Sequence, residues 1–339
     1  MDSARAETLV ASFSEQCVAV VGDLMLDRYI WGAATRISQE APVPVVQVRR
    51  STAAPGGAGN VLGNLAALGA RAVAVGAVGG DAAGETLREL LTEQGVSVRG
   101  LVTTPDRRTC EKTRVIAGAQ QVVRVDTEDT APLESPWRER LEQTLEEVIA
   151  EEQVSAIIVE DYAKGAVSAE LLRGVIALGA AHGVPVALDP HSANAHETPG
   201  LQIMTPNRSE AFALAGVYEP SPGEAPAADP ALARAAARLL ERWGVEELLI
   251  TLGPGGMLLF RQGHGPPRHI PTRAREVFDV SGAGDTAIAA YVLARAAGAT
   301  PEESAEMANH AAGVVVGKIG TAPVYHAELL RSFQEAPQP

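Results

Sequence analysis

Short apolar runs that end in polar residues recur along this chain, and helix-compatible stretches separate them. Residues 18–21, 156–159 and 184–188 are such runs. Strands that are apolar throughout are typical of parallel sheets covered by helices on both faces, whereas strands with one solvated face alternate between apolar and polar residues. The pattern therefore predicts an α/β fold around a central, mostly parallel sheet.

The polar residues that follow these runs indicate where a ligand binds. They are Gly22-Asp23, Glu160-Asp161, Asp189-Pro190 and, after a shorter run, Thr205-Pro206-Asn207. Open parallel sheets bind their ligands beyond the carboxyl ends of the strands. We therefore expect a functional site at this edge of the predicted sheet.

Two segments depart from the pattern of buried strands. The apolar stretch 43–48 is interrupted by proline, which disfavours a central strand, and Tyr29 to Trp31 precede it. Residues 109–125 alternate in the way that paired strands do. We expect a small sheet outside the core, with elements at about 29–50 and 109–125.

The charge balance argues against two classes of partner. The 339 residues include 28 Lys and Arg against 42 Asp and Glu, a formal net charge of −14. So acidic a chain is a poor general binder of polyanions, which excludes nucleic acid and anionic membranes as expected partners. Cys17 and Cys110 provide no disulfide framework or metal-ligand spacing, and no signal peptide or membrane-spanning run is evident. We expect a cytoplasmic protein.

The segment Asp279-Val280-Ser281-Gly282-Ala283-Gly284-Asp285 carries the strongest functional signal. We expect Val277 and Phe278 to end a strand and 286–297 to be helical, which places the small residues at a helix N-terminus. Converging backbone N–H groups and the helix dipole favour an anion there. An acid at position 285 would repel that anion, unless Asp285 is a base that takes a proton from an attacking hydroxyl.

Spacing alone leaves other interpretations of this segment open. It fits an N-cap with a tight turn, and Gly282-x-Gly284-x-x-Ala287 fits a dinucleotide-binding fingerprint. The fingerprint requires a following strand that ends in an acid, but 301–316 is helix-compatible, which weakens that interpretation. Residues 313–318 resemble a P-loop, but the spacing is one residue short and Ile319 replaces the hydroxyl residue.

A second glycine-rich segment, Gly56-Gly57-Ala58-Gly59-Asn60, opens a helix that we expect over 60–68. It is either a flexible loop capped by Asn60 or a place where the backbone approaches a polyhydroxylated ligand closely. Asp23 and Asp27 follow the first strand, where carboxylates can accept sugar O–H bonds. Each of them alone is more often a turn or cap residue.

Groups that suit phosphates come next. Asn207 and Glu210 face one side of a first helical turn, which suits a hydrated Mg²⁺ on phosphates and equally suits a helix cap. The glycine-rich turn at 251–256 is a weak signal by itself. Four cations near these features would together suit a phosphate carried by the substrate; they are Lys112, Arg114, Arg124 and Lys164.

The two glycine-rich segments, 56–60 and 279–285, resemble the two signatures of the ribokinase-like (PfkB) carbohydrate kinases, and the resemblance extends over about 15–325. Within that family, more specific motifs look like those of D-glycero-β-D-manno-heptose 7-phosphate kinases. These motifs are residues 22–29, 36–46, 120–121 with 124–126, 161–165 and 205–210.

The resemblance implies a three-layer α/β/α sandwich that carries a small β-lid, and relatives often pair through such lids in a homodimer. It implies one kinase domain at 15–330, an N-terminal extension at 1–14 and a tail at 331–339. The implied cofactors are ATP and Mg²⁺; the sequence does not decide whether a monovalent cation also binds.

The resemblance also implies roles for individual residues. Asp285 would be the catalytic base, and the amides of Gly282, Ala283 and Gly284 would form an anion hole. Positions implied for the nucleotide and its phosphates are Asn207, Glu210, Thr251, Gly253, Gly256, Asn309 and Gly313, with Glu210 on the metal. Positions implied for the sugar phosphate are Asp23, Asp27, Gly57, Asn60, Lys112, Arg114, Arg124 and Lys164.

Two departures from the heptose kinase pattern bear on specificity. Asp189-Pro190-His191-Ser192 stands where Asp-Pro-Lys-Gly is usual, and Ser281 replaces the commoner Thr. The expected reaction is phosphoryl transfer from ATP to C1 of the heptose 7-phosphate, which gives the 1,7-bisphosphate used in ADP-heptose synthesis. The alternatives are a related kinase of another sugar or sugar phosphate, and a non-catalytic sugar- or nucleotide-binding protein on the same scaffold.

Overall fold

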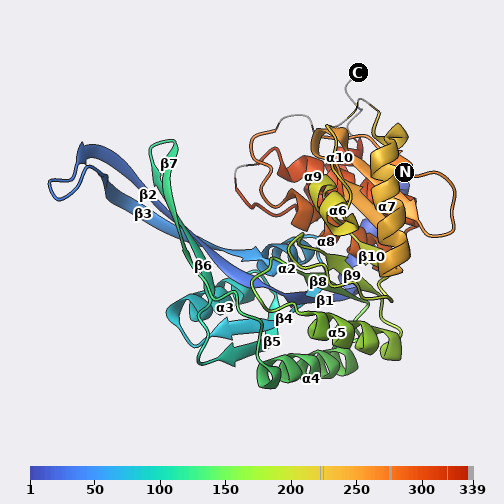
Figure 1. The fold of residues 1–339 in the computed structure, drawn as a ribbon, viewed down its shortest axis with the longest axis horizontal. Coiled ribbons are helices and arrows are strands. Elements are labelled where there is room, and N and C mark those ends of the chain that lie inside the picture. Colours follow the sequence, from blue (N-terminus) through green and yellow to red (C-terminus); the bar gives the residue numbers. More distant parts are fainter. Residues whose placement is uncertain (222, 224, 275–276, 319, 335–339) are drawn as a thin grey trace.

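The computed structural model describes residues 1–221, 223, 225–274, 277–318 and 320–334. Within them, one sheet has the spatial order β13-β12-β11-β10-β9-β8-β1-β4-β5 (Figure 1). Neighbouring strands from β5 to β11 are parallel, and β12 and β13 are added antiparallel at one end. The strands are β1 (Cys17–Gly22), β4 (Arg71–Gly79), β5 (Ser97–Thr104), β8 (Ala156–Glu160), β9 (Val186–Asp189), β10 (Ile203–Met204), β11 (Glu247–Thr251), β12 (Met257–Arg261) and β13 (Arg268–Ile270).

Helices cover both faces of this sheet, because alternate residues of each strand point to opposite sides. In β1, Val18 and Val20 belong to one buried apolar cluster, and Ala19 and Val21 belong to the other. The first cluster includes residues of α1 (Ser3–Ala11), α2 (Ala58–Ala67), α3 (Ala82–Glu93), α8 (Ala283–Ala296), α9 (Pro301–Val315) and α10 (His326–Gln334). The second includes residues of α4 (Ser135–Glu152), α5 (Ala169–His182), α6 (Arg208–Ala215) and α7 (Pro230–Trp243). The three-layer α/β/α sandwich expected from the sequence is confirmed.

The strand order changes direction at β1. From this strand the chain builds outward through β4 and β5 on one side, and through β8, β9, β10 and β11 on the other. At such a switch point the connections leave in opposite directions, and a crevice opens beyond the carboxyl ends of the two central strands. Asp23 follows β1 and Asp161 follows β8 at this point.

A second sheet has the order β3-β2-β6-β7. It contains β2 (Leu24–Ile37), β3 (Pro44–Gly57), β6 (Cys110–Ala117) and β7 (Gln120–Thr127). The first residues of β2 are buried and the last are exposed, so the sheet is rooted in the core and its tip projects away from the body (Figure 1). It is built from the segments expected for the lid.

Three details differ from the sequence expectations. Residues 1–14 are no separate extension, because Ala6, Leu9 and Phe13 are buried in the core. Val277 and Phe278 end no strand and have exposed side chains. Residues 331–334, expected as tail, form the last turn of α10, while 335–339 lie outside the described residues.

Within the part of the chain that the structure describes, every helix is too short or too polar to cross a membrane.

Candidate active site

Asp285 lies in the first turn of α8, directly after the glycine turn, and is 7 % exposed. Its Oδ2 atom accepts a hydrogen bond from the Asn60 side-chain amide at 2.6 Å. Its Oδ1 atom accepts a hydrogen bond from the Tyr162 hydroxyl. Each carboxylate oxygen has two lone pairs, so both can accept a further proton donor from a ligand.

Only glycine fits at position 282, where the segment 279–285 packs against Asn60 of the segment 56–60. The φ of Gly282, +77°, is in the left-handed region that favours glycine, and a Cβ atom there would lie 2.4 Å from Nδ2 of Asn60. The glycine therefore permits Asn60 to reach Asp285. The 56–60 and 279–285 segments, far apart in the sequence, form one site.

Burial raises the pKa of Asp285, and the hydrogen bonds from Tyr162 and Asn60 oppose that rise by stabilising the carboxylate. Burial and the charge of Asp285 together raise the pKa of Tyr162 well above its ordinary value, so its hydroxyl remains a proton donor. A buried carboxylate with a raised pKa and oriented neighbours is suited to act as a general base.

A pocket of about 310 Å³ adjoins the glycine turn. It brings together Ala283 and Gly284 from the turn with five of the seven positions expected for the nucleotide, Thr251, Gly253, Gly256, Asn309 and Gly313. Val277, Val280 and Val316 supply apolar surface on its wall. The exposed Val277 and Val280, which lie outside the strands, are thus part of a pocket whose lining residue Gly284 directly precedes Asp285.

Asn207 and Glu210 form a capping box at the start of α6, which confirms the capping interpretation. The Asn207 side chain accepts from the Glu210 backbone N–H at 3.0 Å, and the Glu210 carboxylate accepts from the Asn207 backbone N–H at 2.8 Å. Asn207 also forms a β-bridge with Thr251, a residue of the pocket wall. Burial raises the pKa of Glu210. Its role toward Mg²⁺ stays a prediction.

Asp23 differs from the expectation for a sugar ligand. Its carboxylate accepts hydrogen bonds from the backbone N–H groups of Tyr162, Lys164 and Ala166, at 2.8 to 2.9 Å. The side chain is buried at the switch point and holds the loop after β8, and this loop carries Tyr162 to Asp285. We therefore assign Asp23 to positioning this loop.

Asp27 and three of the four expected cations share one face of the second sheet. In the strand register, Asp27 is opposite Lys112, Tyr29 is opposite Arg114, and Arg114 is opposite Arg124. Residues opposite one another, and residues two apart, point to the same face. Arg114 donates to Asp27 Oδ1 at 2.6 Å, and Asp27 is 5 % exposed.

Arg124 and Lys164 each pair with a carboxylate other than Asp27. Arg124 is paired with Asp126 on the exposed edge strand β7, and Lys164 forms an ion pair of 2.7 Å with Glu128. Gly57, the other expected sugar position, has φ +57°, and a Cβ atom there would lie 2.6 Å from the backbone oxygen of Asp23. The sugar-side positions therefore lie around the base of the second sheet, beside Asp23.

The sequence placed two further acids, Glu160 and Asp189, at the ligand-binding edge of the sheet but gave them no role. Glu160 and Asp189 end neighbouring parallel strands, and one oxygen of each lies within 4.8 Å of the others and of an Asp285 oxygen. Burial and the neighbouring carboxylates raise the pKa of Glu160 and of Asp189. Both oxygens of Glu160 lack a hydrogen-bond partner among the described residues. Hard oxygen ligands of this kind fit Mg²⁺.

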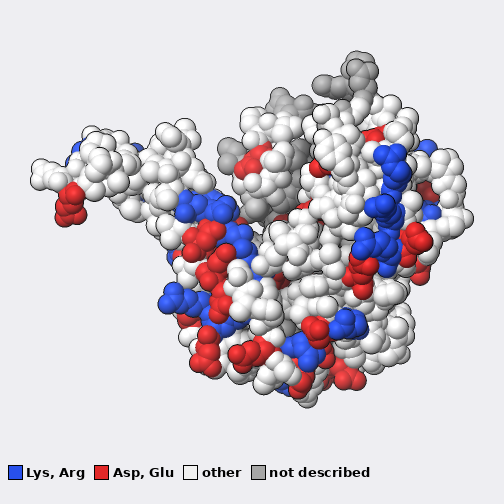
Figure 2. Space-filling view, viewed as in Figure 1, with Lys and Arg blue, Asp and Glu red and all other residues white. Residues whose placement is uncertain are grey.

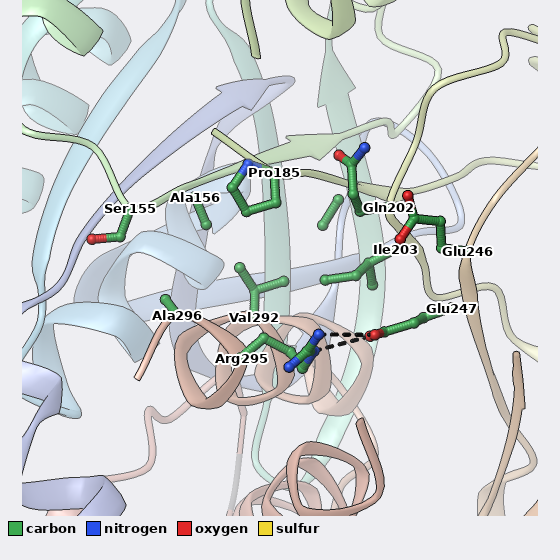
Figure 3. A pocket seen from close by; sticks show the side chains of 11 residues that line it. Ser155, Ala156, Pro185, Gln202, Ile203, Glu246, Glu247, Val292, Arg295 and Ala296 are labelled. Atoms are coloured by element: carbon green, nitrogen blue, oxygen red, sulfur yellow. Dashed lines mark hydrogen bonds and ion pairs between the residues drawn. The ribbon is translucent and has the colours of Figure 1, made fainter. Parts of the chain in front are cut away.

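A second pocket, of about 260 Å³, lies at the opposite edge of the sheet, at the first residues of β8 and β11 (Figure 3). Glu247 there accepts from Arg295 and from the Tyr291 hydroxyl, and Gln202 bonds to backbone groups. These polar groups are satisfied within the protein. The buried acid of this pocket, Glu247, therefore has hydrogen-bond partners, whereas Glu160 at the carboxyl edge has none among the described residues.

Comparison with known proteins bears on the family. The profile of the pfkB family of carbohydrate kinases matches residues 15–327. Proteins named "Bifunctional protein HldE" are 43% identical over 333 residues in Geobacter sulfurreducens and 44% identical over 329 residues in Caulobacter vibrioides. These alignments cover 98% and 97% of this chain but only 66% and 65% of the relatives' own length.

Solved structures share the fold. The ribokinase of Arabidopsis thaliana, described as complexed with ribose and ATP, has a TM-score of 0.72 and 22% identity, covering 95% of this chain and 99% of its own. Phosphofructokinase-2 from Escherichia coli has a TM-score of 0.75 and 22% identity, covering 94% and 98%. The enzyme class expected from the sequence, a sugar kinase, is confirmed: the chain belongs to the pfkB family of carbohydrate kinases.

Proposed function

We propose that this chain transfers the γ-phosphoryl group of ATP to the C1 hydroxyl of D-glycero-β-D-manno-heptose 7-phosphate. The product would be the 1,7-bisphosphate, an intermediate for ADP-heptose synthesis. Family membership supports sugar phosphorylation in general. The motifs at 22–29, 36–46 and 161–165 support the heptose, as does the identity above 40% to the HldE proteins across nearly the whole chain.

One observation carries the proposal: the pocket adjoins the buried base. Ala283 and Gly284 line the pocket, and Asp285 is the next residue along the helix. A nucleotide whose base lies near Asn309 and Gly313 would direct its phosphates toward this helix N-terminus, where the helix dipole stabilises negative charge. A sugar hydroxyl hydrogen-bonded to Asp285 would then be in line to attack.

Different residues carry out different parts of this phosphoryl transfer. Asp285 accepts the proton of the attacking hydroxyl, while Asn60 and Tyr162 hold its carboxylate in place. The amides of the glycine turn stabilise charge on the transferring group, where most catalysis of phosphoryl transfer lies. Mg²⁺, held through Glu210 and the nearby acids, would supply further charge neutralisation on the phosphates.

The contacts favour Lys112 and Arg114 for the 7-phosphate. They lie two residues apart on the sheet face that carries Asp27, and Arg114 is already held by that buried carboxylate. Figure 2 shows Lys and Arg side chains gathered where the second sheet joins the body. Arg124 is one strand farther from Asp27, on the exposed edge strand β7, and Lys164 lies outside the second sheet.

The second sheet would close over the sugar and exclude water, which limits wasteful ATP hydrolysis. Its projecting part exposes apolar side chains, including Val123 (47 %) and Val125 (53 %). Exposed apolar surface of this kind marks an interaction site. We infer that two copies pair through these sheets in a homodimer.

The test is a phosphoryl-transfer assay with ATP and Mg²⁺ across sugars and sugar phosphates. We expect turnover of the heptose 7-phosphate and little turnover of heptose or hexoses that lack the phosphate. The matched variant is Lys112→Met, which should raise KM for heptose 7-phosphate and leave KM for ATP unchanged. Turnover confined to an unphosphorylated hexose would contradict the heptose assignment, and no turnover of any sugar would favour a binding protein.

A further inference from the structure

The loop of residues 161–166 carries Tyr162 to the proposed base, and it adopts a backbone conformation that its own sequence disfavours. Ala163 has φ +52°, in the left-handed region that residues with a Cβ atom rarely occupy. Gly165 has φ +84°, and a Cβ atom there would lie 2.1 Å from the backbone oxygen of Ala131. Such a conformation persists only where the surrounding structure holds it. The contacts that hold this loop therefore determine where the Tyr162 hydroxyl lies.

Arg107 holds this loop from the side of the second sheet. It lies between β5 and β6, and its guanidinium donates a hydrogen bond to the backbone oxygen of Lys164. It also donates to the backbone oxygens of Asp129, at 2.6 Å, and Ala131, at 2.7 Å, which lie between β7 and α4. All the hydrogen bonds that this side chain makes among the described residues go to backbone carbonyl groups. One side chain thus joins three segments of the chain.

The segments that Arg107 joins lie where the second sheet meets the body. The strand β6 begins at Cys110 and β7 ends at Thr127, so Arg107 and Asp129 flank this pair of strands. Asp23, which accepts three N–H groups of the loop, directly precedes β2. The loop is therefore held from two places at the base of the second sheet, and a shift of that sheet would be transmitted to it.

The chemistry of these contacts suits arginine in particular. A guanidinium presents five N–H donors in a rigid planar fork and can bond several carbonyl oxygens at once, whereas a lysine ammonium is a compact charge on a flexible stem. A cation that binds the phosphate of a substrate needs donors that point at the ligand. Three hydrogen bonds of Arg107 are instead made to carbonyl groups of its own chain. The geometry therefore favours positioning over ligand binding.

We propose that Arg107 is a positioning residue that couples the second sheet to the catalytic base. It holds the loop 161–166 in its strained conformation, and the Tyr162 hydroxyl is thereby kept on Asp285. Movement of the second sheet over a bound sugar would act on the base through the same contacts. The inference rests on the proposed function in one respect, the role of Asp285 as the base, and does not depend on which sugar is phosphorylated.

The first test is hydrogen–deuterium exchange of the full chain, followed by mass spectrometry, with no nucleotide and no sugar present. Arg107→Lys keeps the charge but cannot reproduce the planar fork. We expect peptides that span 161–166 to exchange at least about tenfold faster in this variant than in the wild type. The matched control is Arg238→Lys, because Arg238 also bonds to two backbone oxygens, those of Ala215 and Gly216. Its exchange in the loop should equal that of the wild type.

The second test is a double-mutant cycle on kcat, with ATP and whichever sugar the wild type phosphorylates. Arg107→Lys should lower kcat by about tenfold and leave KM for ATP unchanged, because a displaced loop costs orientation of the base. In a Tyr162→Phe background the same substitution should lower kcat by about twofold at most, since the hydroxyl that Arg107 positions is gone. A general structural defect would cost the same in both backgrounds.

Two results would overturn the proposal. One is exchange of the loop at the wild-type rate in Arg107→Lys, and the other is an equal loss of kcat in both backgrounds. Arg107→Gln takes the place of Arg107→Lys, with the same expectations, if the lysine variant does not fold. The exchange measurement involves no phosphoryl transfer, so its outcome is independent of the assay for the proposed function.

Discussion

At the scale of single residues, the site is organised around the two oxygens of Asp285. Asn60 arrives from α2 and Tyr162 from the loop after β8, and each occupies one oxygen. Asp23 fixes that loop through three backbone N–H groups. The orientation of the proposed base therefore depends on a residue that we expected, from the sequence, to bind sugar.

Tyr162→Phe tests this arrangement through the pH profile. Burial raises the pKa of Asp285 and the Tyr162 hydrogen bond lowers it, so removal of the hydroxyl should raise the pKa further. A base works only when deprotonated, so activity is lost as pH falls through the pKa, and the acidic limb of kcat/KM should move to higher pH in the variant. We expect a fall in kcat of about tenfold from lost orientation.

The control for this prediction is Tyr218→Phe, since Tyr218 is 86 % exposed and lies outside the site. Its profile should overlay that of the wild type. An acidic limb that does not move in Tyr162→Phe would show that the hydroxyl does not tune the group that titrates.

Glu160 and Asp189 show which features of a site a sequence reveals and which it does not. Glu160 and Asp189 each follow an apolar run, which is the signal that located Asp23 and Asn207. What the sequence does not contain is the strand order, which makes β8 and β9 neighbours and brings both carboxyl groups to Asp285. Distances between residues on separate strands depend on topology.

At the scale of elements, periodicity located the buried strands and most helices because their burial is two-sided and regular. The expected strand end at 277–278 was wrong for a physical reason. Val277 and Val280 line the pocket beside the glycine turn, so their apolar side chains belong to a cavity wall. An apolar pair carries no information about whether it faces a core or a ligand.

The proposed homodimer interface lies on the second sheet and can be tested by substitutions on β7. Val123 and Val125 lie two residues apart on β7 and point to the face opposite Arg124. In a two-fold interface each substitution appears twice, and an unpaired carboxylate buried there is costly. We expect Val123→Glu with Val125→Glu to convert a dimer into a monomer in analytical ultracentrifugation, with dimer affinity reduced at least about 100-fold.

Tyr218→Glu, at a more exposed position outside the second sheet, should sediment as the wild type does. A wild-type chain that is monomeric at micromolar concentration, or a double variant that stays dimeric, would rule out pairing through this face.

At the scale of the whole molecule, charge and topology act together. A net charge of −14 would repel ATP and a sugar phosphate, yet Lys112, Arg114 and Arg124 share one face of the second sheet. The strand β2 of this sheet begins directly after Asp23, at the switch point. The anions are therefore expected to meet local positive charge at this face. The sequence predicted this fold class because apolar runs separated by helical stretches are local patterns.

The central claim is that Asp285 is the base of a kinase acting on heptose 7-phosphate. The most direct measurement is the steady-state turnover of Asp285→Asn with ATP, Mg²⁺ and heptose 7-phosphate. Asn keeps the shape of the side chain and cannot take the proton, so we predict a fall in kcat of about 10²–10⁴-fold with KM for ATP close to that of the wild type. Turnover near the wild-type rate would contradict the account.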